Sequence, residues 1–495
     1  MSSSNPVDYY YALEATTRVE DITEDEGNQE TLRSLKDGGC YHLAICSRDI
    51  FGEDSDFDPR SSEELGWLGH FAKKSVHLDG IGISGNDIFI NCSEQSVKRF
   101  FDDIGKCNRI KQLYIIETDL NEIIDKLDPV INNNGENITH LCSHRCNMEV
   151  PTAKHLFNFY RGMRSLQKIS VSNDEVDGLD DDDMAVCIPS LEACTGVQEL
   201  KLEFLGLGFN SCAALSIVFP RMNDLLKLDL GYNSIDYDCV QVLVRGLVEC
   251  RHLHELDISN NFIGDDELEM LIQGLPTSVD TLYSCCNGVT LARQLPLLRF
   301  KELYLEGNEL SPVGPRVIAI SLANPECRLE ILNLYQTGVG DDGAATIAES
   351  LINNKRLVSM TLSYSYITET GWYAFSSVLC NAASINATHG SNHTLQHLGG
   401  SEANIPQEIQ TILKLNCGKD KNRVAATKIL QTHHHLNMRP LFDLELDLLP
   451  YVISWQGHYA EYCLRLKLSL IFQFVQAMPM NVIERRDRSS LNSCP

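Results

Sequence analysis

Apolar residues along this chain follow one spaced pattern that returns about every 28 residues. Residues 225–235 read LLKLDLGYNSI and residues 253–263 read LHELDISNNFI, so both segments fit L-x-x-L-x-L-x-x-N-x-L. The L-x-L alternation predicts a short strand with one buried face, and stacked copies would join their strands into a parallel sheet. The pattern therefore predicts a stack of similar units.

The same eleven-residue pattern, here called the frame, can be aligned along most of the chain, and its copies start 21 to 31 residues apart. Its copies start at Ile110, Ile138, Leu166, Val197, Leu225, Leu253, Val279, Phe300, Leu329, Leu357 and Ile385. Residues 76–81, followed by the amphipathic stretch 94–104, form a degenerate candidate for one more unit, which the sequence leaves open. Eleven copies at so narrow a period are not a coincidence.

The ninth position of each unit turns the backbone inward, and its side chain has to satisfy buried amide groups. Asn does this best. The residues in this position are Thr118, Cys146, Asp174, Leu205, Asn233, Asn261, Asn287, Asn308, Thr337 and Ser365.

After the strand, apolar residues at i, i+3, i+4 and i+7 predict a helix in each unit, as in residues 264–275, 340–353 and 368–381. The unit that starts at Val279 lasts only 21 residues, so we expect a short helix around residues 291–298. That shortening predicts an irregularity on the convex face.

These units resemble the ribonuclease-inhibitor-like leucine-rich repeats, found in the ribonuclease inhibitor, the Ran GTPase-activating protein and the sensor arms of NOD-like receptors. The resemblance covers residues 76–395 and implies an α/β solenoid, a horseshoe with a parallel concave sheet, convex helices and a helical C-terminal cap. We divide the chain into an acidic N-terminal arm and cap (1–65), a solenoid of 11 to 12 units (66–395), a cap (396–480) and a polar tail (481–495). Helical patterns at 405–415, 422–430 and 444–455 support the cap, because open solenoids need their apolar ends covered.

The chain carries 41 Lys and Arg against 68 Asp and Glu, for a formal charge of -27 and a pI of about 4.9. Such a field repels phosphate backbones and anionic lipid and attracts basic surfaces. We therefore expect no nucleic acid partner and no membrane partner. The apolar stretch 462–478 includes Arg465 and Lys467, which favours a packing helix over a membrane anchor.

The 18 cysteines are scattered singly, without the spacing of a disulfide framework, which favours a reducing compartment. The first residues, MSSSNPVDYYYALEAT, have neither the basic region nor the apolar run of a signal peptide. We expect a cytoplasmic protein, with the nucleus as the alternative.

The positions of the candidate metal and catalytic residues within the repeat unit argue against such chemistry. Cys142 and His144 occupy outward positions and Cys146 the buried ninth position, so the three do not converge on a metal. The acidic run DGLDDDD at 177–183 lacks calcium-loop spacing and instead suits a helix entry. We find no phosphate loop and no catalytic motif, so we expect no cofactor, no metal and no enzymatic activity.

The outward strand positions predict a binding surface on the concave face. Tyrosines supply contact area at low entropic cost, and interleaved carboxylates would steer a basic or arginine-rich protein. The other interpretation is that tyrosine merely suits a pleated strand. The predicted partner-binding residues are Asp229, Tyr232, Glu255, Asp257, Tyr283, Glu302, Tyr304, Glu306, Tyr335 and Tyr364, and Tyr114, Glu203 and Phe204 share their outward position.

The sequence thus predicts a non-enzymatic scaffold for protein–protein interaction. The alternative is a GTPase-activating or other regulatory protein that resembles the Ran GTPase-activating protein and would need an exposed Arg or Asn in an early repeat. Arg145 is the only outward arginine of the early strands, and no residue matches that family's motif. A sensor arm acting through a separate signalling chain is a third possibility.

Overall fold

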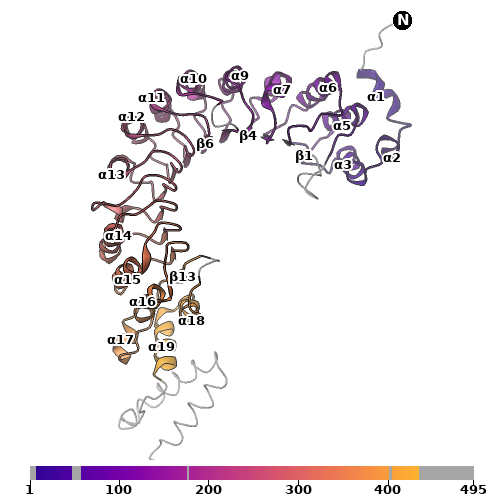
Figure 1. Ribbon diagram of the computed structural model, residues 1–495. Coiled ribbons are helices and arrows are strands. Elements are labelled where there is room, and N and C mark those ends of the chain that lie inside the picture. Colours follow the sequence, from indigo (N-terminus) through magenta and orange to yellow (C-terminus); the bar gives the residue numbers. More distant parts are fainter. Residues whose placement is uncertain (1–6, 47–56, 175–177, 401–403, 434–495) are drawn as a thin grey trace, which may run out of the picture.

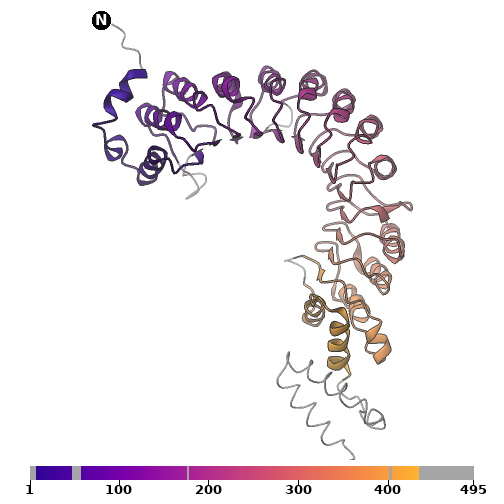
Figure 2. The same cartoon turned by 180° about the vertical axis from the view of Figure 1, so that it is seen from behind.

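The structure, a computed structural model, describes residues 7–46, 57–174, 178–400 and 404–433 of the 495-residue chain. Thirteen strands form one sheet in strict chain order. All are parallel to their neighbours, so the chain winds forward without a crossover. The result is an arc with strands on the inner side and helices on the outer side (Figure 1). The view from behind shows the same row of helices along the outer edge (Figure 2).

The strands begin two residues after the first position of each unit, as the frame predicts. Thus Leu225 precedes Lys227 of β7, and Leu253 precedes Glu255 of β8. The strands are β1 (His42–Cys46), β2 (Gly80–Ser84), β3 (Gln112–Ile116), β4 (His140–Cys146), β5 (Lys168–Asn173), β6 (Glu199–Glu203), β7 (Lys227–Asp229), β8 (Glu255–Asp257), β9 (Thr281–Tyr283), β10 (Glu302–Tyr304), β11 (Ile331–Asn333), β12 (Ser359–Thr361) and β13 (His397–Leu398).

Helices follow the strands on the convex side, including the three predicted from apolar spacing, which are α13, α15 and α16. The helices are α1 (Val7–Leu13), α2 (Val19–Ile22), α3 (Glu26–Asp37), α5 (Ser62–Lys74), α6 (Glu94–Gly105), α7 (Leu120–Ile123), α8 (Asp128–Asn134), α9 (Val150–Tyr160), α10 (Asp181–Cys187), α11 (Phe209–Val218), α12 (Tyr237–Leu247), α13 (Asp265–Gly274), α14 (Gly314–Ala323), α15 (Gly340–Ser350), α16 (Glu369–Leu379), α17 (Ile385–His389), α18 (Gln407–Asn416) and α19 (Lys421–Thr432). Short 3-10 helices, among them η5 (Leu297–Arg299), complete several units. None of the helices in the described ranges is both long and apolar enough to cross a membrane.

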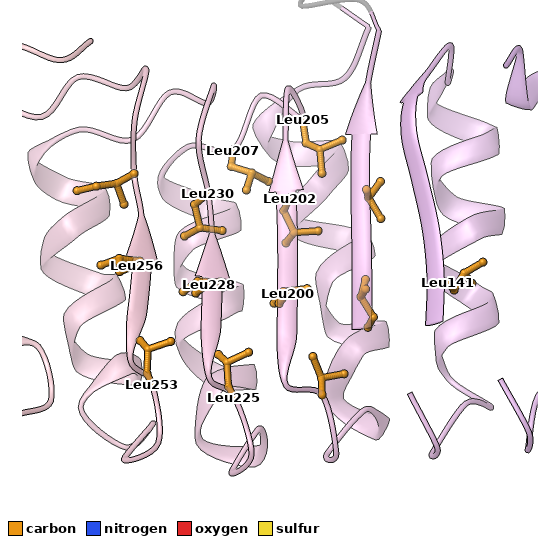
Figure 3. Packing of buried hydrophobic residues seen from close by; sticks show 14 of the residues in the cluster. Leu141, Leu200, Leu202, Leu205, Leu207, Leu225, Leu228, Leu230, Leu253 and Leu256 are labelled. Carbon is orange, nitrogen blue, oxygen red and sulfur yellow. The ribbon is translucent and has the colours of Figure 1, made fainter. Parts of the chain in front are cut away.

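The core lies between the sheet and the helices, where the leucines of the frame form continuous rows (Figure 3). Leu225, Leu228 and Leu230 are at most 1% exposed, and the same positions of other units are buried alongside them. Full burial of one such side chain stabilises the fold by about 1.5–3 kcal/mol. Because every unit repeats these positions, each unit closes the core of its neighbours.

A ladder of asparagines at the ninth position links the middle units, as predicted. The Asn233 Nδ2 donates to the carbonyls of Leu202 and Leu230, and its Oδ1 accepts from the amide of Leu205. Asn261, Asn287 and Asn308 repeat this arrangement. The side chains thereby satisfy backbone groups that the turn would otherwise leave buried and unpaired.

At the other end of the units, three residues before the start, three units carry a buried cysteine. The Sγ atoms of Cys107, Cys194 and Cys250 lie 3.3, 3.4 and 3.5 Å from carbonyl oxygens of the preceding units. Burial raises the pKa of each of these thiols to about 12. These cysteines therefore serve as small core residues.

Three details of the predicted frame are wrong. The copy at Ile385 is not a strand, because this residue begins helix α17, and the last strand instead follows Leu395. Asp174 is exposed, whereas Asn173 is buried and accepts a hydrogen bond from the amide of Met148. A register shift between β4 and β5 moves the ninth-position role by one residue.

The third error concerns the short unit, in which residues 291–298 do not form the expected helix. The 3-10 turn η5 is the only helical element between α13 and α14, a stretch that the structure describes in full. The Arg299 guanidinium donates to the carbonyls of Ile272, Leu275 and Pro276, so it caps the end of α13. An arginine thus satisfies helix-terminal carbonyls in a unit that has lost its own helix.

At the N-terminal end, the sheet starts earlier than the frame predicted. The open unit near residue 76 is confirmed as β2 and α6, and β1 precedes it inside the segment 1–65. Helix α1 packs on α5, where Tyr10 fills the space left by Gly66. His70 Nε2 donates a hydrogen bond to the Glu14 carboxylate, which also pairs with Lys74.

At the C-terminal end, α18 and α19 lie where the patterns at 405–415 and 422–430 predicted helices. The buried Lys428 ammonium donates to the carbonyls of Leu379 and Asn392, which fastens α19 to the last repeats. The expected helix at 444–455 and the tail 481–495 lie outside the described residues.

Candidate functional site

The concave surface consists of the side chains that alternate with the buried leucines. In β8, the buried Leu256 stands between Glu255 and Asp257, which are both partly exposed. Parallel register aligns equivalent residues, so one row runs from Lys201 through Asp229 and Asp257 to Tyr283, Tyr304 and Asn333. Of the predicted residues, Asp229, Glu255, Asp257, Tyr283, Glu302 and Tyr304 lie in the strands, and Glu306 and Tyr335 lie two residues beyond a strand end.

The frame placed Tyr232 and Tyr364 in strands. In the structure they lie in the turns that follow β7 and β12. Both have positive φ angles, of 56° each, and are 45% and 57% exposed. The eighth position of the unit has this left-handed conformation throughout most of the solenoid, from Glu117 to Tyr364. Since bulky residues rarely adopt it, the fold spends conformational energy to hold these rings at the rim of the sheet.

Three aromatic pairs join neighbouring units along the concave side. Tyr283 and Tyr304 stack with ring centroids 4.2 Å apart and planes 13° apart. Phe204 and Tyr232 stack at 4.3 Å and 20°, and Tyr335 meets Tyr364 edge to face at 5.3 Å. Such pairs contribute about 0.5–1.5 kcal/mol of stability in addition to the effect of burying the rings. The stacking also orients the rings before a partner binds.

Lysines neutralise the acids on the first half of this surface. Lys168 binds Glu199 at 2.7 Å, and Lys227 binds Glu255 at 2.9 Å. Lys201 lies 2.8 Å from Glu203 and 3.1 Å from Asp229. Burial lowers the pKa of Lys201, but its hydrogen bonds and charges with these two carboxylates give a net rise.

Sequence analysis missed these lysines, although their positions in the frame mark them as outward. Lys201 occupies the same place in its unit as Asp229 and Asp257 do in theirs. The alternation of charge from strand to strand was the available signal.

Three acids on or next to β8 and β10 have no such ion pair. Asp257, Glu302 and Glu306 have no lysine or arginine within ion-pair distance among the residues that the structure describes. The Tyr304 hydroxyl donates to Glu302 at 2.9 Å, and the Asn333 amide donates to Glu306 at 3.0 Å. Burial raises the pKa of Asp257, and the nearby charge of Asp229 adds to this rise.

The other candidate sites stay apart from this surface. Within the described ranges, no group of His, Cys, Asp and Glu side chains is arranged to hold a metal ion. The acidic run enters helix α10 as predicted, with Asp180 accepting from the amide of Asp183. Arg145, the arginine considered for GTPase activation, lies near the end of β4 with a positive φ of 50° and pairs with Glu117 at 3.5 Å.

A family model described as Leucine Rich repeat matches residues 249–271. The ribonuclease inhibitor of Sus scrofa is 24% identical to this chain over 277 residues, which are 46% of this chain and 58% of the inhibitor. With the repeats and the solenoid described above, these matches show a leucine-rich-repeat chain that is similar to the ribonuclease-inhibitor-like type. The NACHT, LRR and PYD domains-containing protein 3 of Macaca mulatta is 24% identical over 320 residues, which are 55% of this chain and 29% of that protein.

This leucine-rich-repeat chain therefore spans little more than half the length of the inhibitor and less than a third of the NACHT protein. Among solved structures, an internalin from Listeria monocytogenes aligns with a TM-score of 0.39 and 13% identity, over 78% of this chain and 98% of the internalin. A repeat scaffold of this type suits protein–protein interaction in general.

Proposed function

We propose that this protein is a non-catalytic scaffold that binds a basic protein on its concave face. The uncompensated carboxylates of Asp257, Glu302 and Glu306, which adjoin the stacked rings of Tyr283 and Tyr304, carry this assignment. These carboxylates accept hydrogen bonds from neutral groups, but no lysine or arginine of the described residues forms an ion pair with them. A cationic partner would supply the missing compensation.

The long-range field favours the same class of partner. A net charge of -27 draws cationic proteins toward the chain, and a concave surface with acids on its floor concentrates that attraction. Stacked tyrosines then offer rigid contact area of the kind that dominates binding energy in protein interfaces. The Sus scrofa relative is by name a ribonuclease inhibitor, and we carry over from it only the idea of a protein target held by the repeats.

Affinity capture from cell extract tests this function. The test variant is Tyr232→Ala, Tyr304→Ala, Glu306→Lys, which changes only concave positions. A matched control, Tyr237→Ala, Tyr373→Ala, Glu349→Lys, makes the same chemical changes at exposed positions of the convex helices. Circular dichroism checks that both variants fold.

We expect the wild type and the convex control to capture the same basic proteins, and the concave variant to lose them. Raising the salt concentration should weaken the capture, because the attraction is largely electrostatic. Equal capture by the concave variant and the control would refute a concave site.

A further inference from the structure

We infer that Asp257 and Tyr283 form a subsite for a single arginine side chain of the partner protein. The subsite lies on the concave face, and therefore rests on the proposed function. It spans strands β8 and β9, where the two residues are direct neighbours in register. The arginine would stack on the Tyr283 ring and bind the Asp257 carboxylate.

The ring of Tyr283 has one covered face and one face toward Asp257. Tyr283 is paired in register with Tyr304 on one side and with Asp257 on the other. Its ring is nearly parallel to that of Tyr304, with 4.2 Å between centroids, so Tyr304 covers one face. The opposite face points along the same row, toward β8. Stacking on that face brings a planar group close to the Asp257 carboxylate.

Hydrogen bonding holds the second ring of the stack in place. The Tyr304 hydroxyl donates to Glu302 Oε2 at 2.9 Å. This bond and the stacking together orient Tyr304, and Tyr304 in turn supports Tyr283 from behind. A platform whose rings are fixed in advance loses little conformational entropy when a ligand binds.

Asp257 has no ion pair among the described residues, and the charge of Lys201, which acts on it from a greater distance, does not reverse the rise in its pKa. The neighbouring carboxylate of Asp229 already binds Lys201 at 3.1 Å, and Lys227 binds Glu255. Asp257 accepts a hydrogen bond from the amide of Ser259 at 2.8 Å. Like charges on facing strands destabilise a sheet, so Asp229 and Asp257 together disfavour the free state. A guanidinium between Asp257 and Tyr283 relieves that repulsion.

Arginine fits this geometry better than lysine. A guanidinium is planar and weakly hydrated, so it can stack on an aromatic face while its N–H groups bind a carboxylate. A lysine ammonium is a compact, strongly hydrated charge that gains less from the ring. The pairing of an aromatic face with an adjacent carboxylate therefore selects for arginine.

Two defined peptides test the subsite without requiring the natural partner. One alternates arginine with serine and carries a fluorescent label, and the other has lysine at every arginine position. Fluorescence polarisation compares their affinities for the wild type, Asp257→Asn and Tyr283→Leu. Asp280→Asn is the matched control, because it removes the same charge at a residue that pairs with Lys301 outside the subsite.

We expect the wild type to bind the arginine peptide about tenfold more tightly than the lysine peptide. Asp257→Asn should weaken arginine binding about ten- to hundredfold, since it removes a charge-assisted hydrogen bond, and Tyr283→Leu should abolish the preference. Asp280→Asn should retain it. Asp257→Asn should also raise the urea midpoint of the free protein, because it removes an uncompensated carboxylate.

The outcomes separate this subsite from the broader function. If both peptides bind equally, or if Asp257→Asn and Asp280→Asn weaken binding alike, the arginine subsite is wrong and a basic partner on the concave face still stands. If neither peptide binds the wild type, the subsite is likewise refuted, and the capture experiment decides the broader function independently.

Discussion

The asparagine ladder predicts a large loss of stability for Asn261→Ala. This side chain is 8% exposed and lies in the middle of the solenoid. The substitution removes four hydrogen bonds, which join Asn261 Nδ2 to the carbonyls of Leu230, Ile258 and Ser259 and Asn261 Oδ1 to the amide of Ile235.

The three carbonyls each keep another donor after the change, which limits the cost. Asn233 still donates to Leu230, and Asn287 still donates to Ile258. The Tyr232 amide still donates to the carbonyl of Ser259. We count about 0.5 kcal/mol for each of these lost bonds and about 2 kcal/mol for the buried amide that loses its acceptor. The sum is about 3.5 kcal/mol of destabilisation.

Asn261→Asp sharpens this prediction, because it keeps the shape and the acceptor for Ile235. Its second oxygen, however, would face three carbonyl oxygens in place of an amide donor, and its charge would be buried. We therefore expect Asp to destabilise the protein more than Ala does at pH 7. Asn353→Ala, at an exposed turn residue, is the control and should have little effect.

Urea unfolding followed by circular dichroism gives the change in free energy for each variant. Hydrogen exchange of the Ile235 amide gives the local effect, which matters because repeat proteins can open a few units at a time. If Asn261→Asp proved more stable than Asn261→Ala, the hydrogen bonds donated by the amide group would not be what holds the turn, and the reasoning would fail.

Three further changes test the ends and the short unit. Gly66→Ala would place a Cβ 1.9 Å from the Tyr10 hydroxyl, so we expect α1 to detach from α5, and faster proteolysis of residues 7–16 would report it. Arg299→Ala should destabilise the end of α13 by about 2–3 kcal/mol, since buried carbonyls lose their donor, and hydrogen exchange at residues 270–279 should rise. Burial lowers the pKa of Lys428 to about 7, below the value of about 10.4 for a free lysine. The unfolded state therefore binds more protons than the folded state between pH 7 and pH 10, so the free energy of unfolding should increase with pH across that window. Urea unfolding should show this increase in the wild type and not in Lys428→Met.

The strands and the asparagine ladder were predictable because they follow from local rules. A strand with one buried face requires alternation, and a buried turn requires a side chain that both donates and accepts. Those needs recur in every unit and leave the same residues at the same spacing, as Asn233 and Asn261 illustrate. The parallel order of the sheet then follows from stacking alone.

The errors arose where the chain departs from a constant period. Ile385 stands 28 residues after Leu357, yet an additional helix, α17, delays the last strand. Ser384 caps that helix by accepting from the amide of Ala387, a local signal that the frame overrode. The shift from Asp174 to Asn173 reflects an irregular register, which no sequence period encodes.

On the candidate site, the sequence predicted which residues face outward but not how they pair. Whether Asp229 or Asp257 receives Lys201 depends on the reach of one side chain across the register. The stacking of Tyr283 on Tyr304 likewise depends on rotamers that neighbouring strands select. The alternation of residues along a strand determines which side chains point outward, whereas three-dimensional packing determines which of them form ion pairs or stack.

The short unit around η5 has a mechanical consequence for the arch. Strands lie about 4.8 Å apart while packed helices need about 10 Å, so each full unit acts as a wedge that bends the solenoid. Between α13 and α14 the outer row holds only the turn η5, within a stretch the structure describes completely. This unit is a thin wedge, and we expect it to be a compliant joint of the arch. Because this unit contains Tyr283, we expect the arch to bend beside the subsite proposed for the partner's arginine, so that its opening could adjust to the width of the partner.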